Sequence, residues 1–126
     1  MPRYVILAIG AFDYIYSKTG NMLIRYRPDE VVAVIDPEQA GKTANQVLGW
    51  GGDIPCVNSF NNAKDFSPTH LVLGSAPPGG ILNDADRKEI REAVQNGCHI
   101  INGMHVFLND DPELSEQADK NNVVLT

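Results

Sequence analysis

The chain has 126 residues, 43% of them hydrophobic, and its 16 acidic and 10 basic side chains give a net charge of -6. This size and composition suit one globular domain that closes over a single core. The acidic balance and the lack of a basic run argue against nucleic acid as a partner, because nothing would neutralise its phosphates.

The first predicted element is a strand, Tyr4–Ile9, identified by its length and its β-branched residues and ended by Gly10. This apolar run is far shorter than the roughly 20 residues that cross a bilayer. It is also not followed by the cleavage pattern of a signal peptide. We therefore expect a cytoplasmic protein with no membrane partner.

A helix is predicted next over Ser17–Arg27, with Ser17 as its N-cap. Its apolar residues at helical spacing, Met22, Leu23 and Tyr26, predict the buried side of that helix.

The clearest strand signal is Val31–Ile35, an apolar run without alternation that is typical of a strand buried on both faces. An acid, Asp36, follows it directly. A short helix is predicted over Thr43–Leu48, and Gly49 ends it.

The rest of the chain continues the alternation of strands and helices. Three glycines within residues 49–52 predict a loop around Trp50, whose indole could stack on a base, face a partner domain or cover the core. The further predicted elements are a weak strand Pro55–Asn58, a helical turn or two within Asn61–Phe66, a strand His70–Gly74, a helix from Asn83 or Asp84 to Asn96 with Ile90, Ala93 and Val94 on one face and Gly97 at the C′ position, a strand Cys98–Ile101, a helix starting at Asp111–Glu113, and a sixth strand beginning at Val123–Leu125.

Strands that alternate with helices favour parallel pairing, and so an α/β fold: a Rossmann-like three-layer sandwich with a mostly parallel sheet of five to six strands. Ligands of such folds bind in a crevice outside the carboxyl ends of the strands. The loops expected there are Gly10–Ser17, Asp36–Thr43, Ser75–Gly80 and Gly103–Asp111.

The segment Asp36–Thr43, DPEQAGKT, nearly matches a phosphate-binding loop, except that Asp36 stands where the first glycine belongs. An acid at the mouth of such a loop would repel the anion. Two readings stay open: Gly41, Lys42 and Thr43 hold a single phosphate or carboxylate, or they form a capped helix with a solvated lysine.

Asp36 also occupies the place where dinucleotide-binding domains put the acid that accepts hydrogen bonds from ribose. The turn after the first strand lacks the G-x-G-x-x-G fingerprint, since Gly10 alone fits it. A standard nicotinamide site is therefore disfavoured.

Two further groups follow buried strands. Pro78, Gly79 and Gly80 belong to a rigid loop that an ordinary crossover does not require, so we expect this loop to contact a ligand or a neighbouring domain. His105 could act as a general base or orient a carboxylate, although no nucleophile accompanies it. His70 and His99 are interpreted as core or edge residues.

Cys56 and Cys98 lack CxxC spacing, so we expect buried free thiols and no metal site.

Several ordered phrases resemble one known family, the N-terminal Rossmann-like domain of the domain-of-unknown-function family 1611. These phrases are Ile24–Asp36, Ala40–Ala44, Val47–Gly49 with Asp53–Pro55, Ala76–Gly80, and Gly103–His105 through Leu114. The resemblance implies a second, C-terminal domain with a genuine P-loop, which this chain does not contain. It also implies a role in D-amino-acid metabolism, since some full-length members are assigned as D-glutamate N-acetyltransferases.

Two functions follow as alternatives. In the first, residues 1–126 form one domain that binds a small molecule for a nucleotide-dependent or acyl-transfer enzyme, with a nucleotide and acetyl-CoA as open ligands and no activity expected of the domain alone. In the second, the domain is a non-catalytic assembly module that packs on a P-loop domain or forms a homo-oligomer.

Overall fold

The computed structural model describes residues 2–9, 18–73, 84–102 and 112–125. In chain order the described elements are β1 (Tyr4–Leu7), α1 (Lys18–Tyr26), β2 (Val31–Ile35), α2 (Ala44–Leu48), β3 (Cys56–Val57), α3 (Phe60–Ala63), β4 (His70–Leu73), α4 (Asp84–Gln95), β5 (His99–Asn102) and α5 (Pro112–Asn121). Three short 3-10 helices, η1 (Pro28–Glu30), η2 (Pro37–Gln39) and η3 (Lys64–Phe66), join them.

The five strands form one sheet in the order β3-β2-β1-β4-β5, and every pairing is parallel. The central strand β1 pairs with β2 on one side and β4 on the other, and its residues Val5, Ile6 and Leu7 are almost fully buried. The predicted Rossmann-like α/β fold is confirmed.

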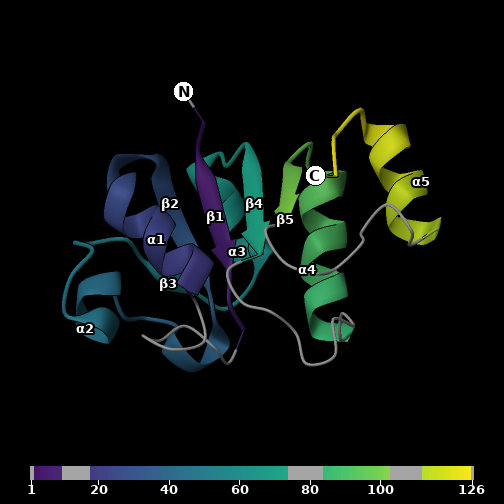
Figure 1. The fold of residues 1–126 in the computed structure, drawn as a ribbon. Helices are drawn as coiled ribbons and strands as arrows, with labels where there is room; N and C mark the ends of the chain where they lie inside the picture. Colours follow the sequence, from purple (N-terminus) through teal and green to yellow (C-terminus); the bar gives the residue numbers. More distant parts are fainter. Residues whose placement is uncertain (1, 10–17, 74–83, 103–111, 126) are drawn as a thin grey trace.

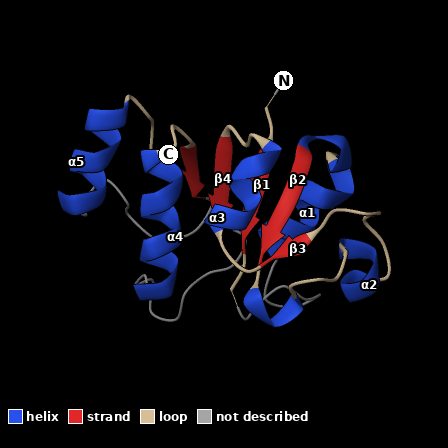
Figure 2. Ribbon diagram, turned by 180° about the vertical axis from the view of Figure 1, so that it is seen from behind, coloured by secondary structure: helices blue, strands red, loops and turns tan. Residues whose placement is uncertain are grey.

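Helices cover both faces of the sheet (Figures 1 and 2). On one face, Ile24 of α1 and Leu48 of α2 pack against Ile6 and Val34. On the other face α3, α4 and α5 contribute to a larger cluster, which includes Phe60, Ile90 and Leu114. In both views α5 lies beyond α4, at the β5 end of the molecule. The molecule therefore has three layers with a separate core on each side of the sheet.

The fifth strand was predicted to begin at Cys98 but begins one residue later, at His99, because Cys98 takes part in the turn that ends α4. The Cys98 N–H donates to Ala93 O at 2.9 Å and the Gly97 N–H donates to Val94 O at 3.0 Å, which is a Schellman motif. Gly97 has a φ of +81°, so the prediction of a C′ glycine is confirmed.

The predicted first and sixth strands are also longer than the observed ones. β1 ends at Leu7, since its partner β2 ends at Ile35, although the Ala8 N–H still donates to Ile35 O at 3.1 Å. At the C-terminus, a single parallel bridge joins Leu125 to Ile100 in place of a full strand. The weak third strand keeps only two residues, Cys56–Val57.

The apolar side predicted for α1 was right for Leu23, which packs against the core, and wrong for Met22 and Tyr26. Met22 is 53% exposed and Tyr26 is 67% exposed, whereas Asn21 and Ile24 are buried. Asn21 and Ile24 lie three residues apart and share the face of the helix that packs on the sheet. Met22 and Tyr26 lie four residues apart and share a face that points outward.

A buried carboxylate joins two helices on the larger cluster's face. Glu89 of α4 is 5% exposed, and its Oε2 accepts a hydrogen bond from the backbone N–H of Phe60, the first residue of α3. That N–H would otherwise lack a partner at the helix start. Burial raises the pKa of Glu89 above its ordinary value, against the opposing effect of the Phe60 N–H.

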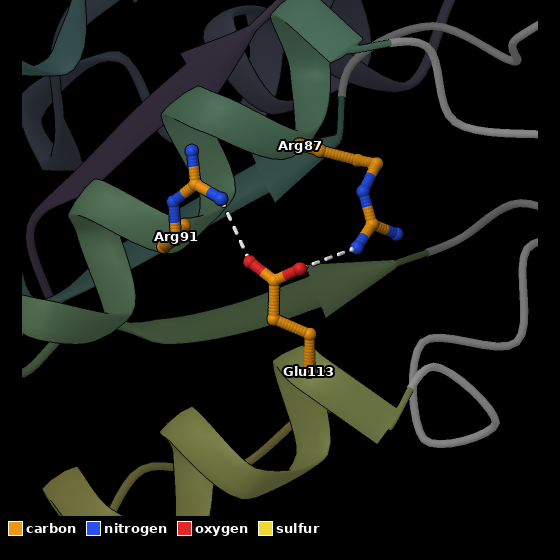
Figure 3. Close-up of polar contacts among 3 residues, drawn as sticks. All are labelled: Arg87, Arg91 and Glu113. Atoms are coloured by element: carbon orange, nitrogen blue, oxygen red, sulfur yellow. Dashed lines mark hydrogen bonds and ion pairs between the residues drawn. The ribbon is translucent and has the colours of Figure 1, made fainter.

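An ion-pair fork joins α4 to α5 at the surface (Figure 3). The two oxygens of Glu113 accept from Arg91 at 2.7 Å and from Arg87 at 3.1 Å. The hydrogen bond from Arg91, with a smaller contribution from Arg87, lowers the pKa of Glu113. Because the two arginines lie one turn apart on α4, the carboxylate fixes where α5 begins relative to that helix.

We predict that Glu89→Gln and Glu89→Ala differ in stability. The glutamine keeps an oxygen for the Phe60 N–H, whereas alanine leaves that buried donor without its partner and should cost about 1–3 kcal/mol of unfolding free energy. Because the folded pKa of Glu89 is raised, its ionisation disfavours the fold as pH rises from 4.5 toward that pKa. Glutamine removes this loss. Urea unfolding at pH 4.5 and pH 7 would test it, and equal stability of the two variants would contradict the capping role.

Candidate functional site

The structure describes one of the four loops predicted at the crevice. Because all the paired strands are parallel, the chain leaves β1, β2, β4 and β5 at the same edge of the sheet. The segment after β2, residues 36–43, is described in full. The other predicted site residues, Pro78, Gly79, Gly80 and His105, lie outside the described residues.

Asp36 stands at the carboxyl end of β2, as predicted, and is 1% exposed. Its Oδ1 accepts from the N–H of Glu38 at 3.1 Å, which caps the 3-10 helix η2. Its own N–H donates to Val57 O on β3 at 3.0 Å. The acid therefore fixes the turn that leaves the sheet, and its burial limits how far it can reach a ligand in this conformation.

The backbone amides of the GKT segment all donate within the protein. A phosphate-binding loop works by pointing such N–H groups at the anion. The donors and acceptors are Gly41 N to Cys56 O (3.1 Å), Lys42 N to Gln39 O (3.0 Å), Thr43 N to Gln46 Oε1 (2.9 Å) and Ala44 N to Ile54 O (2.8 Å). An anion at this loop would therefore depend on side chains.

The sequence predicted Thr43 as the first residue of the short helix. In the structure Thr43 is the N-cap, and α2 begins at Ala44. Its hydroxyl accepts from Gln46 N at 3.3 Å while the Gln46 side chain accepts from the Thr43 N–H, which is a capping box. Gly41 has a φ of +90° with open space where a Cβ would stand, so its glycine serves the turn and not a close approach of another backbone.

Lys42 is exposed, and its Nζ donates to Gln39 Oε1 at 3.2 Å. The charges of Lys42 and Asp36 both affect the pKa of the Cys56 thiol. The backbone carbonyl and N–H of Cys56 bond to Gly41 and Lys42 and so hold the loop to β3. Burial first, and then the charge of Asp36, raises the pKa of Cys56 to about 11, while Lys42 lowers it slightly. The thiol is thus protonated at neutral pH and is unsuited to act as a nucleophile.

A groove that the sequence reasoning did not identify lies on the side of α1 and α2. It has a volume of about 690 Å³. One side is the end of α1 and the turn that follows it, and the other side is residues 50–54. The first segment leads into the amino end of β2. In the second segment, Gly52 and Ile54 accept hydrogen bonds from Asn45 and Ala44, directly after the GKT segment. The signal available in the sequence was Trp50 among three glycines.

The loop at this groove is tightly packed. Gly51 has a φ of +104°, and a Cβ there would lie 2.9 Å from Ile24 Cγ2 and 3.0 Å from Ala44 Cβ. Its neighbour Gly52 has a φ of +69° and open space around the Cβ position. Gly51 is therefore required both by its backbone angle and by its two neighbours on α1 and α2.

Two histidines lie side by side at the amino ends of β4 and β5. The ring centroids of His70 and His99 are 5.1 Å apart, and the Tyr4 ring packs on the other side of His70, tilted, with its centroid at 5.5 Å. His99 Nδ1 accepts from the Val124 N–H at 3.0 Å, so this ring helps to hold the C-terminal segment. These contacts are in keeping with the interpretation of His70 and His99 as core or edge residues.

Metal-binding clusters and membrane-spanning helices are both absent from residues 2–9, 18–73, 84–102 and 112–125. In that part of the chain, His, Cys, Asp and Glu side chains form no group of three or more that could hold a metal ion. None of its helices combines the length and apolar character needed to span a membrane. Both cysteines are buried and unpaired, as predicted.

Comparison with known proteins gives matches to a family model, to curated proteins and to a solved structure. The family described as "Domain of unknown function (DUF1611_N) Rossmann-like domain" matches residues 37–126. A "D-glutamate N-acetyltransferase" of Tritonibacter scottomollicae is 25% identical over 92% of this chain and 32% of its own length. Another from a Pseudoalteromonas species is 29% identical over 98% of this chain and 35% of its own length.

A solved structure of a DUF1611 family protein from Anabaena variabilis is also similar. It has 33% sequence identity and a TM-score of 0.87 over 98% of this chain and 36% of the solved one. The present chain thus spans about a third of the length of the curated relatives it matches.

We predict that Gly51→Ala destabilises the protein far more than Gly52→Ala. Both positions have a positive φ, which costs an alanine roughly 1–2 kcal/mol. At Gly51 the added methyl also overlaps Ile24 and Ala44, which adds about 1–3 kcal/mol. Chemical denaturation of both variants measures the difference. Equal losses would show that the two close contacts do not limit the packing.

We predict that His70 makes the protein less stable in acid. Burial, and then the charge of His99, lowers the folded pKa of His70 below 6.5. Between that folded pKa and 6.5 the unfolded chain binds more protons, so stability falls as pH drops through this window. His70→Gln should flatten this part of the pH profile in urea unfolding. A variant with the same slope as the natural chain would contradict the assignment.

Proposed function

We propose, because this chain belongs to the DUF1611_N family of Rossmann-like domains, that it is the ligand-binding Rossmann-like domain of a larger enzyme of the D-glutamate N-acetyltransferase type. The observation that carries the proposal is the coverage of the two curated relatives. Nearly the whole chain matches proteins of that name that are about three times as long. The chain thus corresponds to one part of such an enzyme.

In this proposal the ligand lies at the carboxyl edge of the sheet. Asp36 shapes the turn there, and the exposed ammonium of Lys42 contacts an anionic group such as a phosphate of a nucleotide or of acetyl-CoA. Gly41 and Thr43 act through the shape of the turn, since their N–H groups are already bonded.

The remaining predicted residues join the same site. Pro78, Gly79 and Gly80 follow β4 in the chain and His105 follows β5, so the proposal places them at the edge where these strands end. His105 is proposed as a general base that takes a proton from the amine that is acylated. The cytoplasmic location stays a prediction.

A non-catalytic assembly module is the second candidate. The backbone N–H groups of the GKT segment favour it, because they already donate within the protein and so are not free to bind a phosphate. In this case the chain packs on a P-loop domain of the full-length protein or on a second copy of itself.

We predict that a thermal-shift panel separates these two functions. The chain is heated with ATP, NAD, acetyl-CoA, D-glutamate or L-glutamate in large excess. A ligand at about 100 times its dissociation constant adds roughly 2.7 kcal/mol, enough to raise the melting temperature of a domain this size by several degrees. Lys42→Ala should abolish the shift, while Lys120→Ala on α5, a lysine outside the loop, should keep it.

The outcomes point in opposite directions. A shift with ATP or acetyl-CoA that depends on Lys42 supports the ligand-binding proposal. The absence of a shift with every compound would overturn it and favour the assembly module, whose oligomeric state sedimentation would then measure.

A further inference from the structure

The groove beside Trp50 has the size and lining of a small-molecule site. Its volume of about 690 Å³ lies within the roughly 300–1,000 Å³ that is typical of ligand pockets. Its apolar lining comes from Ile24, Pro28, Trp50 and Ile54. Such surface favours an apolar group of a ligand over water.

Charged groups of both signs line the same groove. Arg25 and Asp29 stand on the wall made by α1 and the turn that follows it, and Asp53 stands on the opposite wall. Within the described chain these three side chains have no hydrogen bond or ion pair of their own. A guanidinium and two carboxylates are thus available to a ligand.

The loop that carries Trp50 and Asp53 is held in place before any ligand arrives. Gly51 packs against α1 and α2, the Asn45 N–H donates to Gly52 O at 3.1 Å, and the Ala44 N–H donates to Ile54 O at 2.8 Å. Preorganisation of this kind reduces the entropy that binding loses.

We propose that this groove binds a zwitterionic amino acid with an apolar side chain. Arg25 contacts the carboxylate, Asp29 and Asp53 contact the ammonium, and the side chain lies against Trp50 and Ile54. The indole face adds a cation–π attraction for the ammonium. An acidic side chain would meet the two aspartates, so this site is selective against glutamate.

The site is separate from the crevice of the proposed function. The groove is lined by residues of α1, the turn after it and residues 50–54, and by none of the residues assigned to the proposed crevice. The inference therefore does not rest on the proposed function, and an amino acid here would not occupy the position proposed for the acylation chemistry.

The protein carries its own reporter for this site, because Trp50 is its sole tryptophan. Indole fluorescence is titrated with phenylalanine, which does not absorb at the excitation wavelength. Two analogues each lack one charge: phenethylamine has no carboxylate and 3-phenylpropionate has no ammonium. We expect saturable binding of phenylalanine, with each analogue roughly three- to tenfold weaker and no response to D-glutamate.

Variants assign each charge. In Arg25→Gln, phenylalanine should bind no better than phenethylamine, and in the double variant Asp29→Asn with Asp53→Asn it should bind no better than 3-phenylpropionate. Lys120→Gln removes one positive charge, as Arg25→Gln does, but lies on α5, outside the groove, and should leave the preference intact.

Two results would overturn the proposal. A fluorescence change that does not saturate, or that persists unchanged in Arg25→Gln and in the double aspartate variant, removes the site. Binding of phenethylamine as tight as that of phenylalanine removes the zwitterion and leaves a simple organic cation as the ligand.

Discussion

The parallel pairing of β1 on both sides is the constraint on which the rest of the molecule depends. Val5, Ile6 and Leu7 are buried beneath helices on both faces, and their backbone hydrogen bonds run to β2 and to β4. Because all these strands point the same way, the polypeptide must leave them at one edge. That edge is where a ligand crevice can form, whichever loops line it.

Hydrogen-bond satisfaction decides what the GKT segment can do. The same three residues could open a phosphate-binding loop or a capped helix, and the two uses compete for the same N–H groups. Two neighbours resolve the competition: the carbonyl of Cys56 on β3 accepts from the Gly41 N–H, and the side chain of Gln46 on α2 accepts from the Thr43 N–H. What resembles a motif in the sequence is, in the fold, a segment that pairs with the side of β3 that faces away from β2.

Sequence reasoning located the strands well because buried parallel strands are short apolar runs, as β2 shows with bounds predicted to the residue. It failed where tertiary contacts decide. The exposed Tyr26, the capping carboxylate Glu89 and the groove beside Trp50 all depend on which helix packs where, and local periodicity does not contain that information. Asp36 was placed correctly at a strand end, but its burial was not foreseen.

The two cysteines lie in different layers, Cys56 in the cluster under α1 and α2, and Cys98 in the cluster under α3, α4 and α5. Burial raises the pKa of each thiol to about 11, so both are protonated and shielded in the folded chain. Each becomes reactive only when its own layer opens to solvent. The protein therefore carries one natural labelling site in each of its two hydrophobic clusters. The relative rates of thiol modification would reveal whether the two clusters open to solvent together or independently.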